Sequence, residues 1–513
     1  MALKDNGRLS RREVMRALSL CAAGSATLSP FLSGCRQSAL TTDQREQFGK
    51  KKEGLNNPKF LIVITASGGG SLVDSFCAVR ASEAGANANT LNVYNDTKVT
   101  TPGGSPFRAV AYNSSSIGSI PVPVNANQAA FVNKHTSEML VATTIGTSVN
   151  HVVAQKRSLT GNGAWNGRTM QECMALQYGD GVPLPNVNMG TGGYVERGAD
   201  DTLPSYCYPE VVANPALWPL GLDGAKGIKN LPDRELIDLA RKTRNEKIDP
   251  GSTFGITFQN SPALQRWYAQ RGQSQASLEA MDLITKLNIL PDNPPTIPLT
   301  EYGLSASPDA ANLRAVFPNF FTDNFEGQAA AAFLLLKYRV SVAVTIGPSF
   351  NVVLNNGGIS NPPLAFDFSH QDHRASQAFM WQRILSVADR LIDLLKAEPY
   401  DATSGQTLWD NTMIYVATDF GRTKLRPSGA NQFGTGHDLH NGFLMLSPML
   451  KGGTLLGGVN PTDLSSKTWD TETGAEQVGN TDSNERNVFA GVLHTLGVDT
   501  TGSGLPDCKA FRV

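Results

Sequence analysis

Histidine and aspartate side chains gather in two short segments of this 513-residue chain. Four of its seven histidines lie in segments 367–373 (DFSHQDH) and 437–440 (HDLH), and a fifth, His151, closely follows Ser148. Neutral imidazole and carboxylate together suit a divalent metal such as zinc or manganese. Ligands drawn from several loops are typical of an open catalytic site rather than a closed structural one. We therefore expect these segments to build a metal centre.

Continuous apolar runs lie beside these segments and predict the strands that position them. The runs occupy residues 60–65, 139–143, 340–346, 412–418 and 442–446. Runs without alternation are typical of strands buried on both faces of a parallel sheet. Helical patterns accompany them at residues 329–338, 376–396 and 487–496. This order predicts an α/β fold with a mainly parallel sheet between helices.

Candidate side chains follow most of these predicted strands, at the sheet edge where open parallel sheets bind ligands. Glycines 68–70 follow the first predicted strand, and Asp419 follows the fourth. The second predicted strand ends at residue 143, where the turn 143–151 begins. Each segment alone is more often a tight turn, a solvated turn or a helix cap. Asp419 and Arg422, for example, equally suit a helix cap and its ion-pair partner. The joint pattern at one edge is what favours a site.

The composition excludes several classes of protein. Lys and Arg number 44 against 45 Asp and Glu, so no basic excess indicates a nucleic-acid partner. Hydrophobic residues make up 40% of the chain and charged residues 17%, which suits a folded core rather than a disordered scaffold. Outside the N-terminus, no apolar run approaches the ~20 residues of a membrane helix. Proline and glycine interrupt residues 195–310, which we expect to form an irregular insertion in a domain spanning residues 59–513.

The N-terminal segment has the pattern of an export address. Residues 10–15 read SRREVM, a weakly apolar stretch follows, and LSGC ends at Cys35. This pattern resembles a twin-arginine export signal that ends in a bacterial lipobox. We expect residues 1–35 to be that signal, a lipid on Cys35 to anchor the protein to a membrane, and residues 36–58 to be a flexible tether. The expected location is the periplasm or the cell surface.

Four cysteines follow the tether: Cys77, Cys173, Cys207 and Cys508. An exported compartment permits disulfides, and four cysteines allow three pairings that the sequence does not separate. Buried free thiols are the alternative. None of the four lies in a C-x-x-C pair, which argues against a thiolate metal site.

The combined order of motifs resembles a known exported family. A small-residue turn, the turn with His151, the 367–373 segment, FGRT at 420–423 and the 437–440 loop occur in that order. They resemble the family catalogued as domain of unknown function 1501, itself similar to the alkaline phosphatase and sulfatase superfamily. The resemblance covers most of residues 59–510. It implies a largely parallel sheet between helices, one or two metals, a Ser or Thr nucleophile, and hydrolysis or transfer of phosphate or sulfate esters.

Carried over to matching positions, the resemblance implies a set of site residues. Metal ligands are expected at Asp367, at His370 or His373, at Asp419 and at His437. Ser148 is the expected nucleophile, with His151 beside it and Arg422 as a bidentate fork for the ester oxygens. Asp438 or Asp372 is expected to orient a ligating imidazole. The implied metal is zinc, manganese or calcium.

This sequence departs from the family pattern at two positions, and these differences leave more than one function open. Asp419-Phe420 stands where the superfamily often has Asp-His, and Asn150 stands where the exported family usually has serine. These differences leave a single-metal site or a degenerate binding fold as alternatives to a two-metal enzyme. We expect an exported, lipid-anchored, metal-dependent hydrolase of small-molecule or polymer-borne phosphate or sulfate esters. The alternative is a catalytically degenerate surface lipoprotein of the same fold that binds a glycan or a protein partner.

Overall fold

The computed structural model describes most of the chain after residue 56. The described residues are 57–112, 116–117, 120–121, 128–222, 232–261, 264–265, 268, 281–292, 297–348, 365–477 and 484–513. The predicted export signal, Cys35 and the tether up to residue 56 lie outside them. Within the described part, no helix combines the length and the apolar character needed to cross a membrane.

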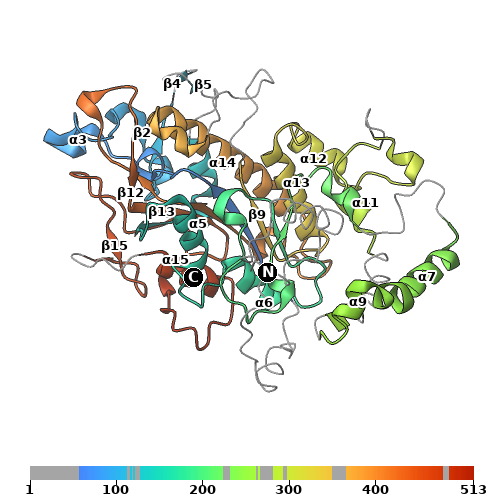
Figure 1. Ribbon diagram of the computed structural model, residues 1–513. Helices are drawn as coiled ribbons and strands as arrows, with labels where there is room; N and C mark the ends of the chain where they lie inside the picture. Colours follow the sequence, from blue (N-terminus) through green and yellow to red (C-terminus); the bar gives the residue numbers. More distant parts are fainter. Residues whose placement is uncertain are drawn as a thin grey trace, which may run out of the picture. The chain divides into compact units, whose positions relative to one another are not determined.

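Eight strands form one mixed sheet through the centre of the described fold (Figure 1). Their order is β14 (Thr454–Leu456), β6 (Met139–Ile145), β13 (His440–Leu446), β10 (Thr412–Thr418), β1 (Phe60–Ala66), β9 (Ala343–Ile346), β7 (Asn186–Asn188) and β8 (Glu210–Val211). Each of the five apolar runs overlaps one of these strands, which confirms those predictions, although β9 begins at Ala343 rather than at residue 340. The protein therefore has an α/β fold with a mostly parallel sheet.

Strand β13 is the exception, because it pairs antiparallel with both β6 and β10. His440, at its start, lies opposite Ile145, at the end of β6. The segment that precedes β13 therefore reaches the same sheet edge as the segments that follow β6 and β10. This reversed strand brings residues 437–440 to the edge at which the other candidate segments lie.

Helices cover both faces of the sheet (Figure 1). On one face, Phe60, Ile62 and Ile64 of β1 pack in one hydrophobic cluster with α13 (Asn324–Lys337) and α14 (His373–Ala397). On the other face, Leu61 and Val63 pack with α6 (Met170–Tyr178) and α15 (Glu485–Thr495). Alternate side chains of a strand point to opposite faces. Both faces of β1 are therefore buried, which explains its unbroken apolar run.

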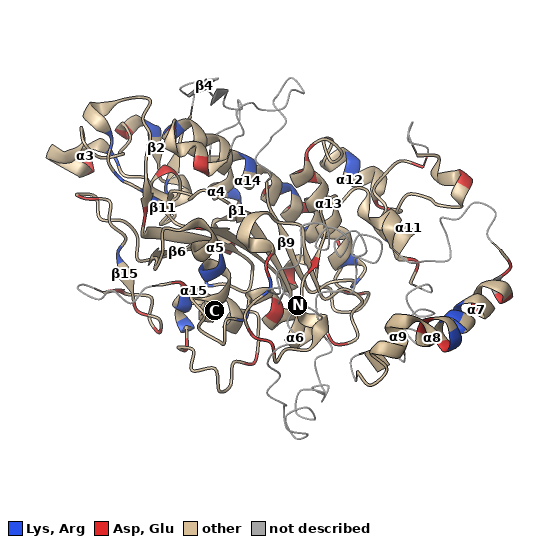
Figure 2. Ribbon diagram, in the orientation of Figure 1, with Lys and Arg blue, Asp and Glu red and all other residues tan. Residues whose placement is uncertain are grey.

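Short elements complete the fold. They include α5 (His151–Thr160), α3 (Ala81–Ala84), α4 (Gln128–His135), α12 (Ala310–Val316), and the strand pairs β2–β3 (Val99–Thr100, Ala109–Val110), β4–β5 (Ser116–Ile117, Ile120–Pro121), β11–β12 (Gly421–Arg422, His437–Asp438) and β15–β16 (Thr468–Trp469, Glu476–Gln477). The described part of residues 195–310 contains α7 (Arg234–Thr243), α8 (Asp249–Gly251), α9 (Thr253–Thr257) and α11 (Leu283–Leu287). Basic and acidic residues are interspersed over the described elements (Figure 2). The four cysteines after the tether are buried free thiols.

Candidate metal centre

Asp419 and Gly68 lie side by side because their strands pair in register. Ala66 ends β1 opposite Thr418, the last residue of β10, so the next residues of the two strands meet. The Gly68 N–H lies 3.0 Å from both carboxylate oxygens of Asp419. Gly68 has a φ of +104°, and a Cβ atom there would lie 2.0 Å from the Asp367 nitrogen. Glycine is therefore required for the Asp367 segment to approach this edge.

His151 faces the buried Asp419 from the start of α5. The Asn150 side chain caps this helix by accepting a hydrogen bond from the Val153 N–H. His151 Nδ1 lies 2.8 Å from Asp419 Oδ2, and Nε2 lies 3.5 Å from Asp367 Oδ1. The hydrogen bond with Asp419 raises the pKa of His151, against the opposing effect of burial. The carboxylate thus orients the ring so that Nε2 points toward Asp367.

His370 and His437 meet through their Nε2 atoms, which lie 2.9 Å apart. His370 Nε2 is also 3.4 Å from Asp367 Oδ1. His437 Nδ1 lies 2.9 Å from the carbonyl oxygen of Val149, to which an Nδ1–H can donate. Burial lowers the pKa of both imidazoles, and the nearby Arg422 lowers it further. Both rings therefore favour the neutral form, which is the form that binds metals.

We call His151, Asp367, His370 and His437 the imidazole cluster. The donor atoms of three members, His151, Asp367 and His437, all lie within 4.8 Å of one another, so this group can hold a metal ion. Neighbouring ligands on a tetrahedral zinc ion are about 3.3 Å apart, since zinc–nitrogen distances are about 2.0 to 2.1 Å. Within that group, the 3.5 Å between His151 Nε2 and Asp367 Oδ1 is close to this value, and His370 Nε2 lies beside the group, 3.4 Å from Asp367 Oδ1 and 2.9 Å from His437 Nε2. The donor set therefore fits a zinc-like ion.

His373 does not share these contacts. Its ring is fully buried, with Nε2 2.8 Å from Asp74 Oδ2 and Nδ1 2.8 Å from Thr435 Oγ1. Both ring nitrogens are thus occupied by protein partners. The sequence left His370 and His373 as alternative ligands, and the structure brings His370 to Asp367 and His437.

Asp419, predicted as a ligand, contacts the cluster through His151 rather than facing its centre. A carboxylate on the far nitrogen of an imidazole is the usual way to orient a metal-binding histidine. The two carboxylates predicted for that task have other contacts. Asp372 caps α14 through the Ala375 N–H, and Asp438 accepts the His440 N–H.

Arg422 holds the loops of the site together. Its guanidinium is fully buried and donates to the carbonyl oxygens of Gly68, Phe366 and Thr435, and to Asp367 Oδ1 at 3.0 Å. Desolvation lowers the pKa of Arg422, while Asp367 opposes that effect. The expected fork for ester oxygens is therefore occupied by the protein itself. Arg422 ties the turn after β1 to the Asp367 loop and to Thr435.

Two hydroxyls lie on segments that meet the cluster. Ser148 Oγ accepts a hydrogen bond from the Asn150 N–H, in the turn that leads to His151. Ser67 Oγ, directly after β1, accepts a hydrogen bond from Gln155 Nε2 at 3.2 Å. The same Nε2 lies 3.4 Å from Asp419 Oδ2. Neither Ser67 nor Gln155 is among the site residues predicted from the sequence, although Ser67 directly follows the first predicted strand.

No protein-family model matches this chain, and no curated protein matches it. Two solved structures to which it is similar are those of Ps i-CgsB, alone and in complex with k-i-k-neocarrahexaose. Both are 10% identical in sequence, and each comparison covers 88% of this chain and 75% of the other. The TM-scores are 0.33 and 0.32. Similarity this distant does not indicate a function for the chain.

Proposed function

We propose that this protein is a metal-dependent hydrolase of phosphate or sulfate esters with an alkaline-phosphatase-like fold. We further propose that it is exported and anchored to a membrane through a lipid on Cys35. The ion would be held by the imidazole cluster. Three imidazoles and one carboxylate favour zinc or manganese over calcium, because calcium prefers an all-oxygen ligand set.

The orientation of two imidazoles is the observation that carries this proposal. Asp419 occupies Nδ1 of His151, and the Val149 carbonyl occupies Nδ1 of His437. An Nδ1–H donated to such an acceptor leaves the lone pair on Nε2. In both residues Nε2 then faces another member of the cluster, Asp367 Oδ1 at 3.5 Å from His151 and His370 Nε2 at 2.9 Å from His437. His373 instead uses both nitrogens for partners outside the cluster.

The residues around the cluster would prepare an ester for hydrolysis. When bound, a divalent ion supplies Lewis acidity, which polarises the ester and neutralises charge on its oxygens. Asp419 and the Val149 carbonyl hold the imidazoles in place, and Arg422 fixes the Asp367 loop. A rigid set of ligands keeps its geometry as the reaction proceeds, which is the general advantage of preorganisation.

Ser67 and Ser148 are the two hydroxyls available as the nucleophile. Gln155 links Ser67 to Asp419, and Asp419 contacts His151, so Ser67 belongs to the network of the cluster. Ser148 was the nucleophile expected from the sequence, and its hydroxyl oxygen accepts a hydrogen bond from the Asn150 N–H. Replacing each serine by alanine distinguishes them, because only loss of the nucleophile abolishes formation of a covalent intermediate.

One observation favours the alternative of a non-catalytic surface lipoprotein. The Arg422 fork is bound to main-chain carbonyls and Asp367, so it has no free pair of donors for an ester. A glycan or protein partner would not need a guanidinium at that position. Metal binding with no hydrolysis of any ester would support this alternative.

Metal analysis combined with an ester assay tests the proposed function. We expect the purified protein to retain zinc or manganese, and to hydrolyse 4-nitrophenyl phosphate or 4-nitrophenyl sulfate. A chelator should lower the thermal midpoint, because a ligand at 100 times its Kd adds about 2.7 kcal/mol to stability. His437→Ala should abolish metal binding and hydrolysis.

His440→Ala is the matched control for that variant. His440 lies three residues further on, and its Nδ1 accepts the Ser466 N–H outside the cluster. The control should retain both the metal and the activity. If the wild-type protein bound no divalent ion and His437→Ala changed nothing, the proposed function would be wrong.

A further inference from the structure

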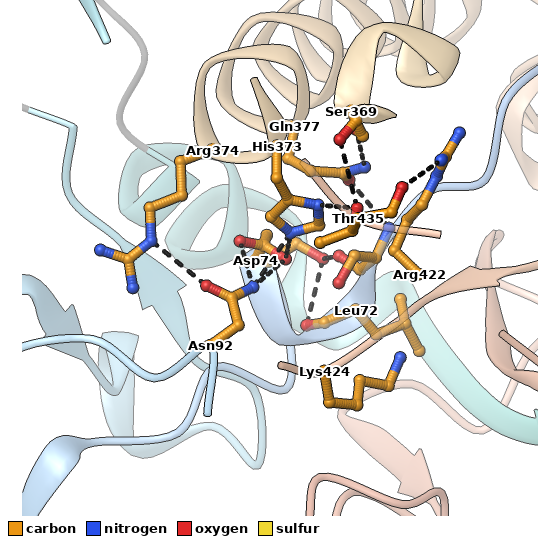
Figure 3. Close-up of polar contacts among 12 residues, drawn as sticks. Leu72, Asp74, Asn92, Ser369, His373, Arg374, Gln377, Arg422, Lys424 and Thr435 are labelled. Carbon is orange, nitrogen blue, oxygen red and sulfur yellow. Dashed lines mark hydrogen bonds and ion pairs between the residues drawn. The ribbon is translucent and has the colours of Figure 1, made fainter. Parts of the chain in front are cut away.

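A second group of histidine and carboxylate lies buried in the fold (Figure 3). Asp74 and His373, which we call the buried pair, are both 0% exposed. The side-chain amide of Asn92 donates to both carboxylate oxygens of Asp74, at 3.1 and 3.0 Å. The Tyr94 hydroxyl donates to Asp74 Oδ1. Burial alone would raise the pKa of Asp74, but His373 and the Tyr94 hydroxyl hold it well below its usual range. Asp74 therefore remains a carboxylate inside the fold.

The buried pair is fixed to elements from distant parts of the sequence. Asp74 ends the short 3-10 helix Leu72–Asp74, directly after the glycine turn of β1. His373 is the first residue of α14, and its ring stacks on Phe433 with centroids 5.4 Å apart. The backbone N–H of His373 also donates to the backbone carbonyl oxygen of Phe433, at 2.8 Å. The pair thus holds the start of α14 against the segment that leads to His437.

Thr435 connects the buried pair to the imidazole cluster, and Figure 3 shows it beside His373 and Ser369. Its hydroxyl lies 2.8 Å from His373 Nδ1 and donates to the Ser369 carbonyl at 3.3 Å. Its N–H donates to the same carbonyl at 2.8 Å, and its own carbonyl accepts Arg422 Nη1 at 3.1 Å. Thr435 precedes His437 by two residues, and Ser369 directly precedes His370. One residue therefore touches the buried pair and both histidine loops.

We propose that Thr435 is a positioning residue that holds His370 and His437 at ligand distance by linking their loops to the buried pair. This inference rests on the proposed function, because it concerns the geometry of the metal ligands. The Thr435 hydroxyl contacts both His373 Nδ1 and the Ser369 carbonyl oxygen. Both contacts disappear if the hydroxyl is removed.

Burial of this link makes the hydroxyl difficult to replace. Thr435 is 4% exposed and the His373 ring is 0% exposed, so solvent does not reach the contact. A valine at position 435 has nearly the same shape but leaves His373 Nδ1 without a partner, which is costly in a buried site. Serine keeps the hydroxyl and loses only a methyl group. The Thr435→Val and Thr435→Ser variants therefore separate hydrogen bonding from packing.

The decisive measurement is zinc affinity by competition with a coloured chelator. We expect Thr435→Val to weaken zinc binding about 10- to 100-fold, the usual effect of losing a contact that orients a ligand. Thr435→Ser should bind zinc within about threefold of the wild type, since it keeps that contact. Thr435→Ala, which also lacks the hydroxyl, repeats the test if the valine variant does not fold.

Thr412→Val is the matched control. Thr412 is fully buried, and its hydroxyl donates to the Leu408 carbonyl at 2.6 Å. It starts β10, whereas Asp419 follows the end of that strand, about 20 Å away. The control should lose thermal stability without losing zinc affinity.

Three results would overturn the inference. Equal zinc affinity of Thr435→Val and the wild type would show that the hydroxyl does not position the ligands. Equal weakening by Thr412→Val would show that general destabilisation is the cause. If the wild type itself bound no zinc, the proposed function would be wrong, and this inference with it.

Discussion

The imidazole cluster and the buried pair contain the same side chains under opposite conditions. In the cluster, the side chains of His151, His370 and Asp367 are 38%, 45% and 43% exposed. In the buried pair, Asp74 and His373 are 0% exposed, and both nitrogens of the imidazole have protein partners. His370 and His373 are only three residues apart in the sequence. Residue type and spacing therefore do not decide which histidine is available for a metal.

The difference comes from where each ring lies relative to α14. His370 ends the 3-10 helix Phe366–His370, which precedes α14. His373 is the first residue of α14, and its ring stacks on Phe433. A fully bonded buried group makes a fold more rigid. A half-exposed imidazole such as His370 is instead accessible to a ligand from solvent. We infer that the buried pair serves stability and position, and that the cluster serves chemistry.

The largest expected effect separates the two regions by stability. His373→Ala removes the partner of a buried carboxylate, which should lower the free energy of unfolding by about 3 to 5 kcal/mol. His370→Ala changes a half-exposed side chain and should lower it by no more than about 0.5 kcal/mol. Urea unfolding of the metal-free proteins measures both values. If His370→Ala were the more destabilising of the two, the view that the buried pair contributes more to stability than the imidazole cluster would be wrong.

Much of the sheet and part of the site could be predicted from the sequence. The run at 412–418 matches β10 residue for residue, because a strand buried on both faces leaves a continuous apolar signal. Asp367, His370 or His373, Asp419 and His437 were expected to meet, because segments that flank strand ends share one edge of a sheet. Of these, the structure brings Asp367, His370 and His437 into contact. His151 was expected beside them and contacts Asp367.

Other features depend on contacts that a sequence does not display. The reversed direction of β13 is decided by its partners β6 and β10. The choice between His370 and His373 depends on the partners Asp74 and Thr435, which are about 300 and 60 residues away. Arg422 was expected to bind an ester. In the structure it binds three main-chain carbonyls instead, and the sequence does not show this because these carbonyls belong to loops that only the folded chain brings together.

A smaller effect tests how the cluster is oriented. Asp419→Asn keeps the size of the side chain but removes the charge that faces His151 Nδ1. We expect zinc affinity to fall about 10- to 100-fold, or about 1.4 to 2.7 kcal/mol, as for other carboxylates that orient a ligating histidine. Isothermal titration with zinc measures it.

Asp438→Asn is the control for that change. Asp438 is adjacent to His437 and accepts the His440 N–H, so the same substitution there should leave zinc affinity within about twofold of the wild type. Equal losses in the two variants would indicate a general effect of negative charge near the ion, and not an orienting contact between Asp419 and His151.

The smallest expected effect concerns acid unfolding and the buried pair. The pKa of Asp74 in the folded protein lies well below the ordinary value of 3.8, so its stabilising effect is present above that value and is lost as the pH falls toward the folded pKa. Between pH 5 and pH 3, protonation of Asp74 in the unfolded chain should lower the free energy of unfolding by about 1 kcal/mol. In Asp74→Asn/His373→Gln neither position titrates over that range. The difference in unfolding free energy between wild type and double variant should therefore narrow by about 1 kcal/mol, measured by urea unfolding at each pH. A constant difference would mean that Asp74 is not held as a carboxylate by the buried pair.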